Sequence, residues 1–423
     1  MKDNVSFIEK RKTFYETIPN FWHDLFEEEY ALFDIKLEKR EKINQLRVAS
    51  NQIWRIFKKT VPLIRELKDE TLVELGFPVQ TLPYVRILSK MDIETVIGRF
   101  DFSYDKGYFK LLEFNADTPT FIKETFSINQ FVCDHFKVKN PNRNMEKDLA
   151  FSIRKAVVES TDIENPKVVF TSHRDHEEDY LTTRYLLEIS GVQNAEYIAL
   201  SDLHLVSEPF EESDRVMERG LYTPNGEKID VLYRQTYPLE HLIEDRDPST
   251  GEYVGKLLLD LVKEGRLTII NPPSAFLLQS KAIQALIWGL HENGHSYFTE
   301  EEHHVIQTYF LPTYLDPDYF YEKKERYVKK PSFGREGDTI VIYEGTGEKI
   351  LEDKNKNYEE SLAVFQKFTE LEPHLIQTEK GHMKTRVMYG CFIISSKASA
   401  VGIRAGGQIT DNTSYFLPIG EIE

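Results

Sequence analysis

The chain has 423 residues, which is enough for one large domain or two to three ordinary ones with an ample core. Its net charge of −17 argues against nucleic acid as a main partner, because phosphate backbones bind basic surfaces. The two cysteines exclude a disulfide framework and a cysteine-based zinc cluster, and no apolar run approaches the roughly 18–20 residues of a membrane span.

The N-terminal part is predicted to contain a helical segment followed by a β-hairpin. Apolar residues recur at spacings near 3.6 over residues 10–70, with charged residues between them, which is typical of amphipathic helices. Gly76, Pro78 and Pro83 interrupt this pattern. Two β-type runs then follow within residues 99–115, so we expect a hairpin there.

The predicted hairpin carries oxygen-bearing side chains at one end. If its strands pair around the turn Asp105-Lys106-Gly107, then Arg99 and Asp101 lie across from Glu113 and Asn115. Two carboxylates and an amide oxygen suit Mg²⁺, which also keeps waters and phosphate oxygens in its shell. For any one of these residues alone, a solvated polar face of the hairpin is the simpler interpretation.

A βαβ pattern follows in residues 161–275. A short β run at 167–170, an amphipathic helix at 177–190 and β runs at 195–200 and 229–233 alternate along the chain. This order predicts a parallel sheet. No GxGxxG sequence opens the helix, so a dinucleotide cofactor is not supported.

The rest of the chain is predicted to be helix and loop up to about residue 330, and then rich in β-strands. The prediction is therefore a mixed fold, with both α+β and α/β features. Its approximate lobes are residues 1–160 with the N-terminal helices and the hairpin, 161–275 with the βαβ unit, and 276–423 with the C-terminal strands.

Two segments have the features of anion-binding loops. Lys330 precedes a loop that contains Gly334, Arg335 and Gly337, and backbone amides beside glycine can approach a phosphate closely. It is not a Walker A loop, because no Gly-Lys-Ser/Thr sequence opens a helix. Arg404 lies just before a glycine pair. Taken singly, each segment is explained as well or better by a turn beside a surface cation.

Three further charged residues have ordinary interpretations when each is considered alone. Glu177 and Glu178 begin a predicted helix, where the helix dipole favours acidic residues. Lys281 lies in an amphipathic helical pattern, where an exposed lysine is common. None of the three indicates a functional site without the other segments.

Together and in this order, these segments resemble the glutathionylspermidine synthase family. The resemblance spans residues 99 to 412 and is carried by RFD (99–101), LLEFNADTPT (111–120), the Glu177-Glu178 pair, NPPSAFLLQSKA (271–282), KKPSFGREG (329–337) and GIRAGGQITDN (402–412). It implies an ATP-grasp-like synthetase, with a βαβ lobe of the pre-ATP-grasp type and an N-terminal helical segment.

The resemblance also implies a role for each matching residue. In the family, the positions that match Asp101, Glu113 and Asn115 hold magnesium, the one that matches Arg99 steadies the transferring phosphoryl group, and the one that matches Arg404 lies near the reacting centre. The nucleotide positions are those of Lys281 and Lys330 on the ATP phosphates, Gly334, Arg335 and Gly337 in the covering loop, and Gln377 on the adenine side. The substrate positions are those of Thr118 and Thr120, which hold the acid, and of Glu177 and Glu178, which meet glutathione and the polyamine.

The implied activity is an ATP- and Mg²⁺-dependent ligation of a carboxylate to an amine through an acyl phosphate. The acid would be glutathione or a similar peptide, and the amine a polyamine or another amine; the acidic composition is compatible with a cationic substrate. Two alternatives stay open: a catalytically silent ATP-binding member that acts as a sensor or interaction protein, and a ligase acting on a protein or cell-wall amine.

Two absences complete the expectations. The segment before Arg99 is short and helical and has no cysteine nucleophile, so we expect no amidase domain. The N-terminus has no secretory apolar region, so we expect a cytosolic protein. The net charge and the absence of a long apolar run add the expectation of no nucleic-acid partner and no membrane span.

Overall fold

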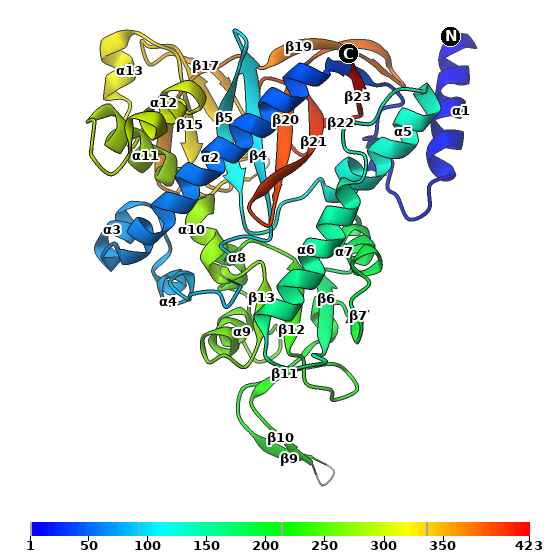
Figure 1. Ribbon diagram of the computed structural model, residues 1–423, viewed down its shortest axis with the longest axis vertical. Coiled ribbons are helices and arrows are strands. Elements are labelled where there is room, and N and C mark those ends of the chain that lie inside the picture. Colours follow the sequence, from blue (N-terminus) through cyan, green and yellow to red (C-terminus); the bar gives the residue numbers. More distant parts are fainter. Residues whose placement is uncertain (1, 92, 213–214, 336) are drawn as a thin grey trace.

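The computed structural model describes residues 2–91, 93–212, 215–335 and 337–423. Two antiparallel sheets lie in the upper part of Figure 1, and a smaller parallel sheet lies below them. Within the described residues, no helix has the length and apolar character that crossing a membrane requires.

In the N-terminal part, three short strands separate the first helix from the three that follow. Its elements are α1 (Lys2–Glu16), β1 (Asp24–Leu25), β2 (Glu28–Glu29), β3 (Lys36–Lys39), α2 (Arg40–Glu66), α3 (Asp69–Glu74) and α4 (Leu82–Val85). The prediction of helix throughout residues 10–70 is therefore wrong for residues 17–39. Pro19 cannot donate a helical hydrogen bond, and β3 instead pairs in parallel with β23 (Ile419–Ile422), at the other end of the chain.

A six-stranded antiparallel sheet contains the predicted hairpin. The strands are β4 (Ile97–Asp105), β5 (Tyr108–Asn115), β19 (Glu372–Thr378), β20 (Gly381–Ile394), β21 (Lys397–Gly406) and β22 (Tyr415–Leu417), and the long β20 pairs with β19, β21 and β4. The hairpin prediction is confirmed, with the turn between Asp105 and Tyr108. The lobe limits near residues 160 and 275 stay a prediction, but this sheet joins strands from the first and third predicted lobes.

Helix α2 covers one face of this sheet (Figure 1). Its Phe57 packs against Phe100 and Phe114, with ring centroids 5.6 Å and 5.3 Å apart. Because strand residues alternate between faces, burying these rings against α2 turns Arg99, Asp101 and their neighbours to the opposite face. Packing of the apolar face of the hairpin against α2 thus fixes the direction of the polar side chains on its other face.

The parallel sheet is the predicted βαβ unit. Its order is β13-β12-β6-β7, all parallel, with β6 (Val168–Ser172), β7 (Ala195–Tyr197), β12 (Val231–Gln235) and β13 (Thr268–Ile270). Around it lie α6 (Met145–Ser160), α7 (Glu177–Ser190), α8 (Leu239–Leu242) and α9 (Val254–Lys263). The small strands β8 (His204–Val206), β9 (Phe210–Glu212), β10 (Arg215–Met217) and β11 (Gly220–Tyr222) lie between β7 and β12 along the chain, and α5 (Asn129–Phe136) contacts β23 in the upper part of Figure 1. The parallel sheet and the helix over 177–190 are confirmed.

The second antiparallel sheet has five strands in the order β14-β18-β15-β16-β17. They are β14 (Thr313–Tyr314), β15 (Tyr327–Pro331), β16 (Val341–Tyr343), β17 (Lys349–Glu352) and β18 (Ala363–Lys367). Helices α10 (Phe276–Gln279), α11 (Ala282–Glu292) and α12 (Glu300–Tyr309) precede β14 along the chain, and α13 (Asp318–Lys323) lies between β14 and β15. This sheet confirms the predicted C-terminal β content.

Candidate active site

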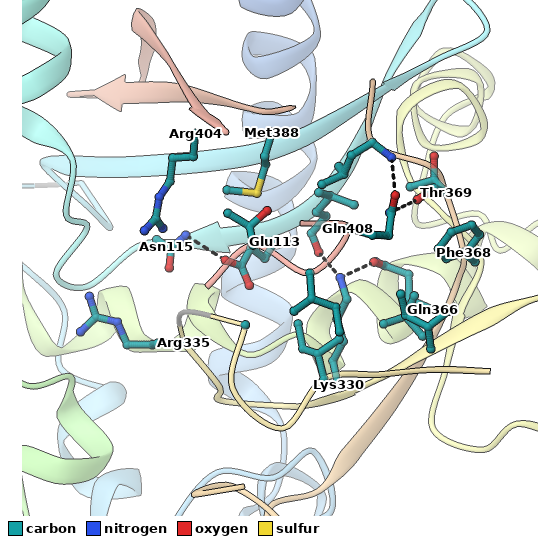
Figure 2. A pocket seen from close by; sticks show the side chains of 18 of the residues that line it. Glu113, Asn115, Lys330, Arg335, Gln366, Phe368, Thr369, Met388, Arg404 and Gln408 are labelled. Carbon is teal, nitrogen blue, oxygen red and sulfur yellow. Dashed lines mark hydrogen bonds between the residues drawn. The ribbon is translucent and has the colours of Figure 1, made fainter. Parts of the chain in front are cut away.

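A cavity lies between the two antiparallel sheets (Figure 2). One wall comes from β4, β5, β20 and β21, and the other from β15, β16 and β18. Its polar lining includes Arg99, Glu113, Asn115, Thr120, Lys330, Arg335, Gln366, Arg404 and Gln408. The fold thus brings together residues that lie up to about three hundred positions apart in the sequence.

The hairpin supplies a charged floor to this cavity. Arg99 lies opposite Asn115 and Asp101 lies opposite Glu113, as the sequence predicts. Arg99 donates from Nε and Nη2 to the two Asp101 oxygens, at 2.7 Å and 2.9 Å, and from Nη1 to the Thr120 carbonyl at 2.7 Å. Burial raises the pKa of Asp101, and the Arg99 charge opposes this rise. Asp101 thus fixes the orientation of Arg99, which lines the cavity.

Glu113 is the ionised carboxylate of the cavity. Its Oε2 lies 3.2 Å from Lys281 Nζ. Burial alone would raise the pKa of Glu113, but the charges of Lys281, Lys330 and Arg99 outweigh it and hold the pKa at about 2. Asn115 turns its amide nitrogen toward Asp101 Oδ2, at 3.0 Å.

The donor set fits a magnesium ion in part. Glu113 and Asn115 line the cavity and offer oxygens, and Mg²⁺ in nucleotide sites commonly takes one or two carboxylates together with phosphate oxygens and waters. Asp101 already accepts hydrogen bonds on both oxygens from Arg99 and is fully buried. Within the described part of the chain, no group of three or more histidine, cysteine, aspartate or glutamate residues has metal-site geometry. The role of Asp101 as a ligand stays a prediction.

Two lysines lie near Glu113, and one of them lines the cavity. Lys330 lines it from the opposite sheet; its Nζ donates to Gln366 Oε1 at 2.8 Å, and burial lowers its pKa to about 8, opposed by the charge of Glu113. Lys281 is buried and is not among the described residues that line the cavity; its Nζ donates to the Gly334 carbonyl at 2.8 Å besides pairing with Glu113. Lys330 is thus placed for an anionic group between the sheets.

The glycine loop between β15 and β16 rests on the hairpin side of the cavity. Arg335 Nη2 donates to the Thr118 carbonyl at 2.9 Å. Gly337 has φ of +73°, and a Cβ there would lie 2.5 Å from the Thr410 carbonyl oxygen. The loop therefore needs glycine at 337 both for its backbone conformation and for its close contact.

Gly337→Ala is expected to loosen this loop. An L-residue in the left-handed region costs about 1–2 kcal/mol, which corresponds to a roughly 5- to 30-fold larger fraction of molecules with the loop undocked. The rate of limited proteolysis within residues 332–338 measures this fraction. Gly265→Ala is the matched control, because Gly265 also has positive φ (+70°) but has open space around its Cβ position. Equal cleavage of this loop in both variants would contradict the account.

The other end of the cavity is an apolar slot. Val328, Ile342, Phe368, Leu371 and Met388 line it, between the two sheets. An apolar slot that continues from a cationic end suits a flat base attached to phosphates. None of these five residues is singled out by the sequence patterns.

Gln377 does not lie in this slot. It is on β19 opposite His382, and its backbone N–H donates to Asp34 Oδ2 at 2.8 Å. The described residues that line the cavity do not include it. Strand β18 borders the cavity through Gln366, whereas Gln377 on β19 lies outside it, and the adenine-side position of Gln377 stays a prediction.

The segment from Asn115 to Thr120 is held by buried contacts from the parallel-sheet part. Asn271 donates from its amide to the carbonyls of Ala116 and Asp117, at 3.2 Å and 2.6 Å. Asp117 pairs with Arg234 at 2.5 Å, and both side chains are almost fully buried. Asp117 is thus a structural residue that connects the hairpin to β12.

A second cavity adjoins the first, and Thr120 and Arg335 line both. Its acidic lining comprises Glu178, Asp179, Glu244, Asp245 and Asp338. Glu178 lines this second cavity, whereas Glu177 is exposed and does not line it, and the roles of both residues stay predictions. Thr118 is buried beside it, and its Oγ1 has no hydrogen-bond partner among the described residues.

Comparison with known proteins agrees with this geometry. A family model described as glutathionylspermidine synthase preATP-grasp matches residues 8–420. A Haemophilus influenzae protein named "Putative acid--amine ligase" is 25% identical over 333 residues, covering 76% of this chain and 73% of that protein. The solved apo structure of a glutathione synthetase-like effector from Globodera pallida superposes with a TM-score of 0.61, covering 99% of this chain and 97% of that one at 10% identity. The last likeness shows the fold alone, and it confirms the ATP-grasp-like fold class.

Proposed function

Because the chain belongs to the glutathionylspermidine synthase preATP-grasp family, we propose that it is an ATP- and Mg²⁺-dependent ligase that joins a carboxylate to an amine. The observation that carries this proposal is the cavity between the two sheets, with cations and Glu113 at one end and an apolar slot at the other. The name of the Haemophilus influenzae relative supports the same reaction class.

This reaction requires that the substrates are held in position and that cations lie near the transferring phosphoryl group; it requires no nucleophilic side chain. The substrate carboxylate attacks the γ-phosphorus of ATP, ADP leaves, and the resulting acyl phosphate is attacked by the amine, which loses a proton as phosphate departs. Charge spreads over the phosphoryl oxygens during the first step, so fixed cations lower its barrier. Arg99, Lys281, Lys330 and Arg404 are the residues we assign to this task.

Magnesium would be held by Glu113 and Asn115, with Asp101 as the third predicted ligand, and it would neutralise phosphate charge when bound. The glycine loop of Arg335 would keep water from the acyl phosphate. In the docked loop, Arg335 already lies at the boundary between the two cavities.

The second cavity would receive the substrates. Thr118 and Thr120 are the proposed contacts of the acid, which can be glutathione or a similar peptide. The acidic lining around Glu178 fits the ammonium groups of a polyamine or another cationic amine. Glu177, which is exposed, is the weaker of the two proposed amine contacts.

Release of ADP from a panel of acids and amines tests this function. We expect release that requires Mg²⁺, one γ-glutamyl or related peptide acid and one cationic amine together, and mass spectrometry is expected to find their amide. Glu178→Gln is expected to raise the KM for the amine more than the KM for ATP. ATP binding without turnover on any pair would instead favour a silent nucleotide-binding member of the family.

A further inference from the structure

Glu124 is a buried acid beside the candidate active site to which the proposed chemistry assigns no role. It begins a π-helical turn, Glu124–Ile128, four positions after Thr120. Its side chain is fully buried, and Tyr30 Oη donates to its Oε1 at 2.5 Å. Its Oε2 has no hydrogen-bond partner among the described residues. A buried carboxylate oxygen without a donor is costly, so it calls for an explanation.

Arg404 has a buried hydrogen-bond donor without an acceptor, which complements the Glu124 oxygen without a donor. Its Nη2 donates to the Asp411 carbonyl at 3.1 Å, while its buried Nε finds no acceptor in the described part of the chain. Figure 2 shows the guanidinium directed from β21 toward Asn115 and the cavity. Arg99, by contrast, has both Asp101 oxygens to fix its orientation. Arg404 therefore lacks the carboxylate partner that the other arginine has.

The backbone brings the two groups to facing elements. Gly402 is two residues before Arg404 on β21, so both point to the same face of the strand. A Cβ at Gly402 would lie 2.5 Å from a ring atom of Phe121 and 2.6 Å from Thr125 Oγ1, the residues that flank Glu124. The face of β21 that carries Arg404 thus lies directly against the π-helical turn.

The electrostatics of the cluster agree with this arrangement. Burial raises the pKa of Glu124, and the charges of Arg404 and Arg99 are among the causes that oppose the rise. Arg404 also lowers the pKa of Tyr30, which burial raises well above its ordinary value. Tyr30 is itself fixed, because Phe416 of β22 donates its backbone N–H to the Tyr30 carbonyl at 2.9 Å.

We propose that Glu124 is a positioning residue for Arg404: Tyr30 holds the carboxylate, and Oε2 accepts the Arg404 Nε–H in the nucleotide-bound enzyme. The chain from Tyr30 through Glu124 then aims the guanidinium at the transferring phosphoryl group. This inference rests on the proposed function, and it gives the N-terminal segment that carries Tyr30 a part in the reaction.

The test is an NMR measurement of arginine Nε–H exchange with water in the full chain, with and without Mg²⁺ and the non-hydrolysable analogue AMPPNP. The Arg404 signal is assigned by its loss in Arg404→Lys. In the wild type we expect the nucleotide analogue to slow its exchange. In Glu124→Gln the exchange should be faster than in the wild type by about tenfold or more, as expected for losing a hydrogen bond to a charged group.

Glu38→Gln is the matched control. Glu38 is also buried and also accepts a tyrosine hydroxyl, from Tyr389 at 2.6 Å, but it lies in a separate network with Lys42. Slowed Arg404 exchange that survives in Glu38→Gln and is lost in Glu124→Gln supports the inference. Equal Arg404 exchange in both variants would overturn it. If Glu124→Gln does not fold, Tyr30→Phe takes its place, with the same expected direction.

The outcome is separable from failure of the proposed function. If no arginine signal responds to the analogue in the wild type, the nucleotide site itself is refuted and this inference with it. If Arg99 and Arg335 respond but Arg404 does not, only the positioning role is refuted. Once a substrate pair is known, Glu124→Gln is expected to lower kcat at least about tenfold with the KM for ATP within about threefold, and Glu124→Asp to recover part of the loss.

Discussion

Asp117→Ala is expected to lower the free energy of unfolding by about 3–5 kcal/mol, because it leaves the Arg234 guanidinium buried without its counter-ion. The Asp117–Arg234 pair is 2.5 Å long, with side-chain exposures of 1% and 2%. Asp117 Oδ2 also accepts the Leu239 N–H at 3.0 Å, at the start of α8. The substitution therefore removes a charge and a hydrogen-bond acceptor at one place. Denaturant unfolding measures the change.

The control for this prediction is Asp162→Ala. Asp162 also pairs with a cation, Lys90 at 3.1 Å, but its side chain is 97% exposed. Exposed pairs contribute roughly 0–1 kcal/mol, so this variant is expected to unfold close to the wild type. A loss below about 1 kcal/mol in Asp117→Ala would contradict the view that this pair connects the hairpin to the parallel sheet.

Arg404→Met is expected to have the largest effect on turnover. An arginine that stabilises a transferring phosphoryl group contributes about 10³–10⁵ in kcat, so we expect a loss of at least about 10³-fold in amide formation. Binding of Mg-ATP should change far less, because Lys281 and Lys330 remain. The measurement is ADP release with the substrate pair found in the panel, alongside the dissociation constant for Mg-ATP.

Arg386→Met serves as the comparison for this loss of charge. Arg386 lies on the neighbouring strand β20 and contacts Glu370 and the Leu371 carbonyl instead of lining the cavity. Its removal is expected to leave turnover within about threefold of the wild type. If the two variants lose similar activity, or if Arg404→Met retains full turnover, the assignment of Arg404 to the reacting centre is wrong.

The parts of the site that the sequence predicts are those with local signals. The hairpin has a turn at Asp105-Lys106-Gly107 and alternating apolar residues on both sides, so the turn and the alternation are enough to predict the cross-strand neighbours of Arg99 and Asp101. The helix over 177–190 is marked by its amphipathic pattern and ends at Gly191, which has φ of +59°. Resemblance then adds Lys281 and Lys330.

The parts that the sequence does not predict depend on distant partners. β3 forms because β23, almost four hundred residues later, offers a strand to pair with. Asp117 has the pattern of an ordinary acidic residue in the sequence, because its buried partner Arg234 is more than a hundred positions away. The location of Gln377 outside the cavity was not predicted, because a short string on β19 carries no information about which end of that strand borders the cavity.

The most direct test of the central claim is thermal unfolding with and without Mg-ATP, in the wild type and in Glu113→Gln. A ligand at roughly 100 times its dissociation constant adds about 2.7 kcal/mol to the folded state. The account predicts that ATP stabilises the wild type only when Mg²⁺ is present. It also predicts that Glu113→Gln loses this stabilisation, while Glu300→Gln, at an exposed position of α12, keeps it. A wild-type protein whose unfolding temperature does not respond to Mg-ATP would contradict an ATP site between the two sheets.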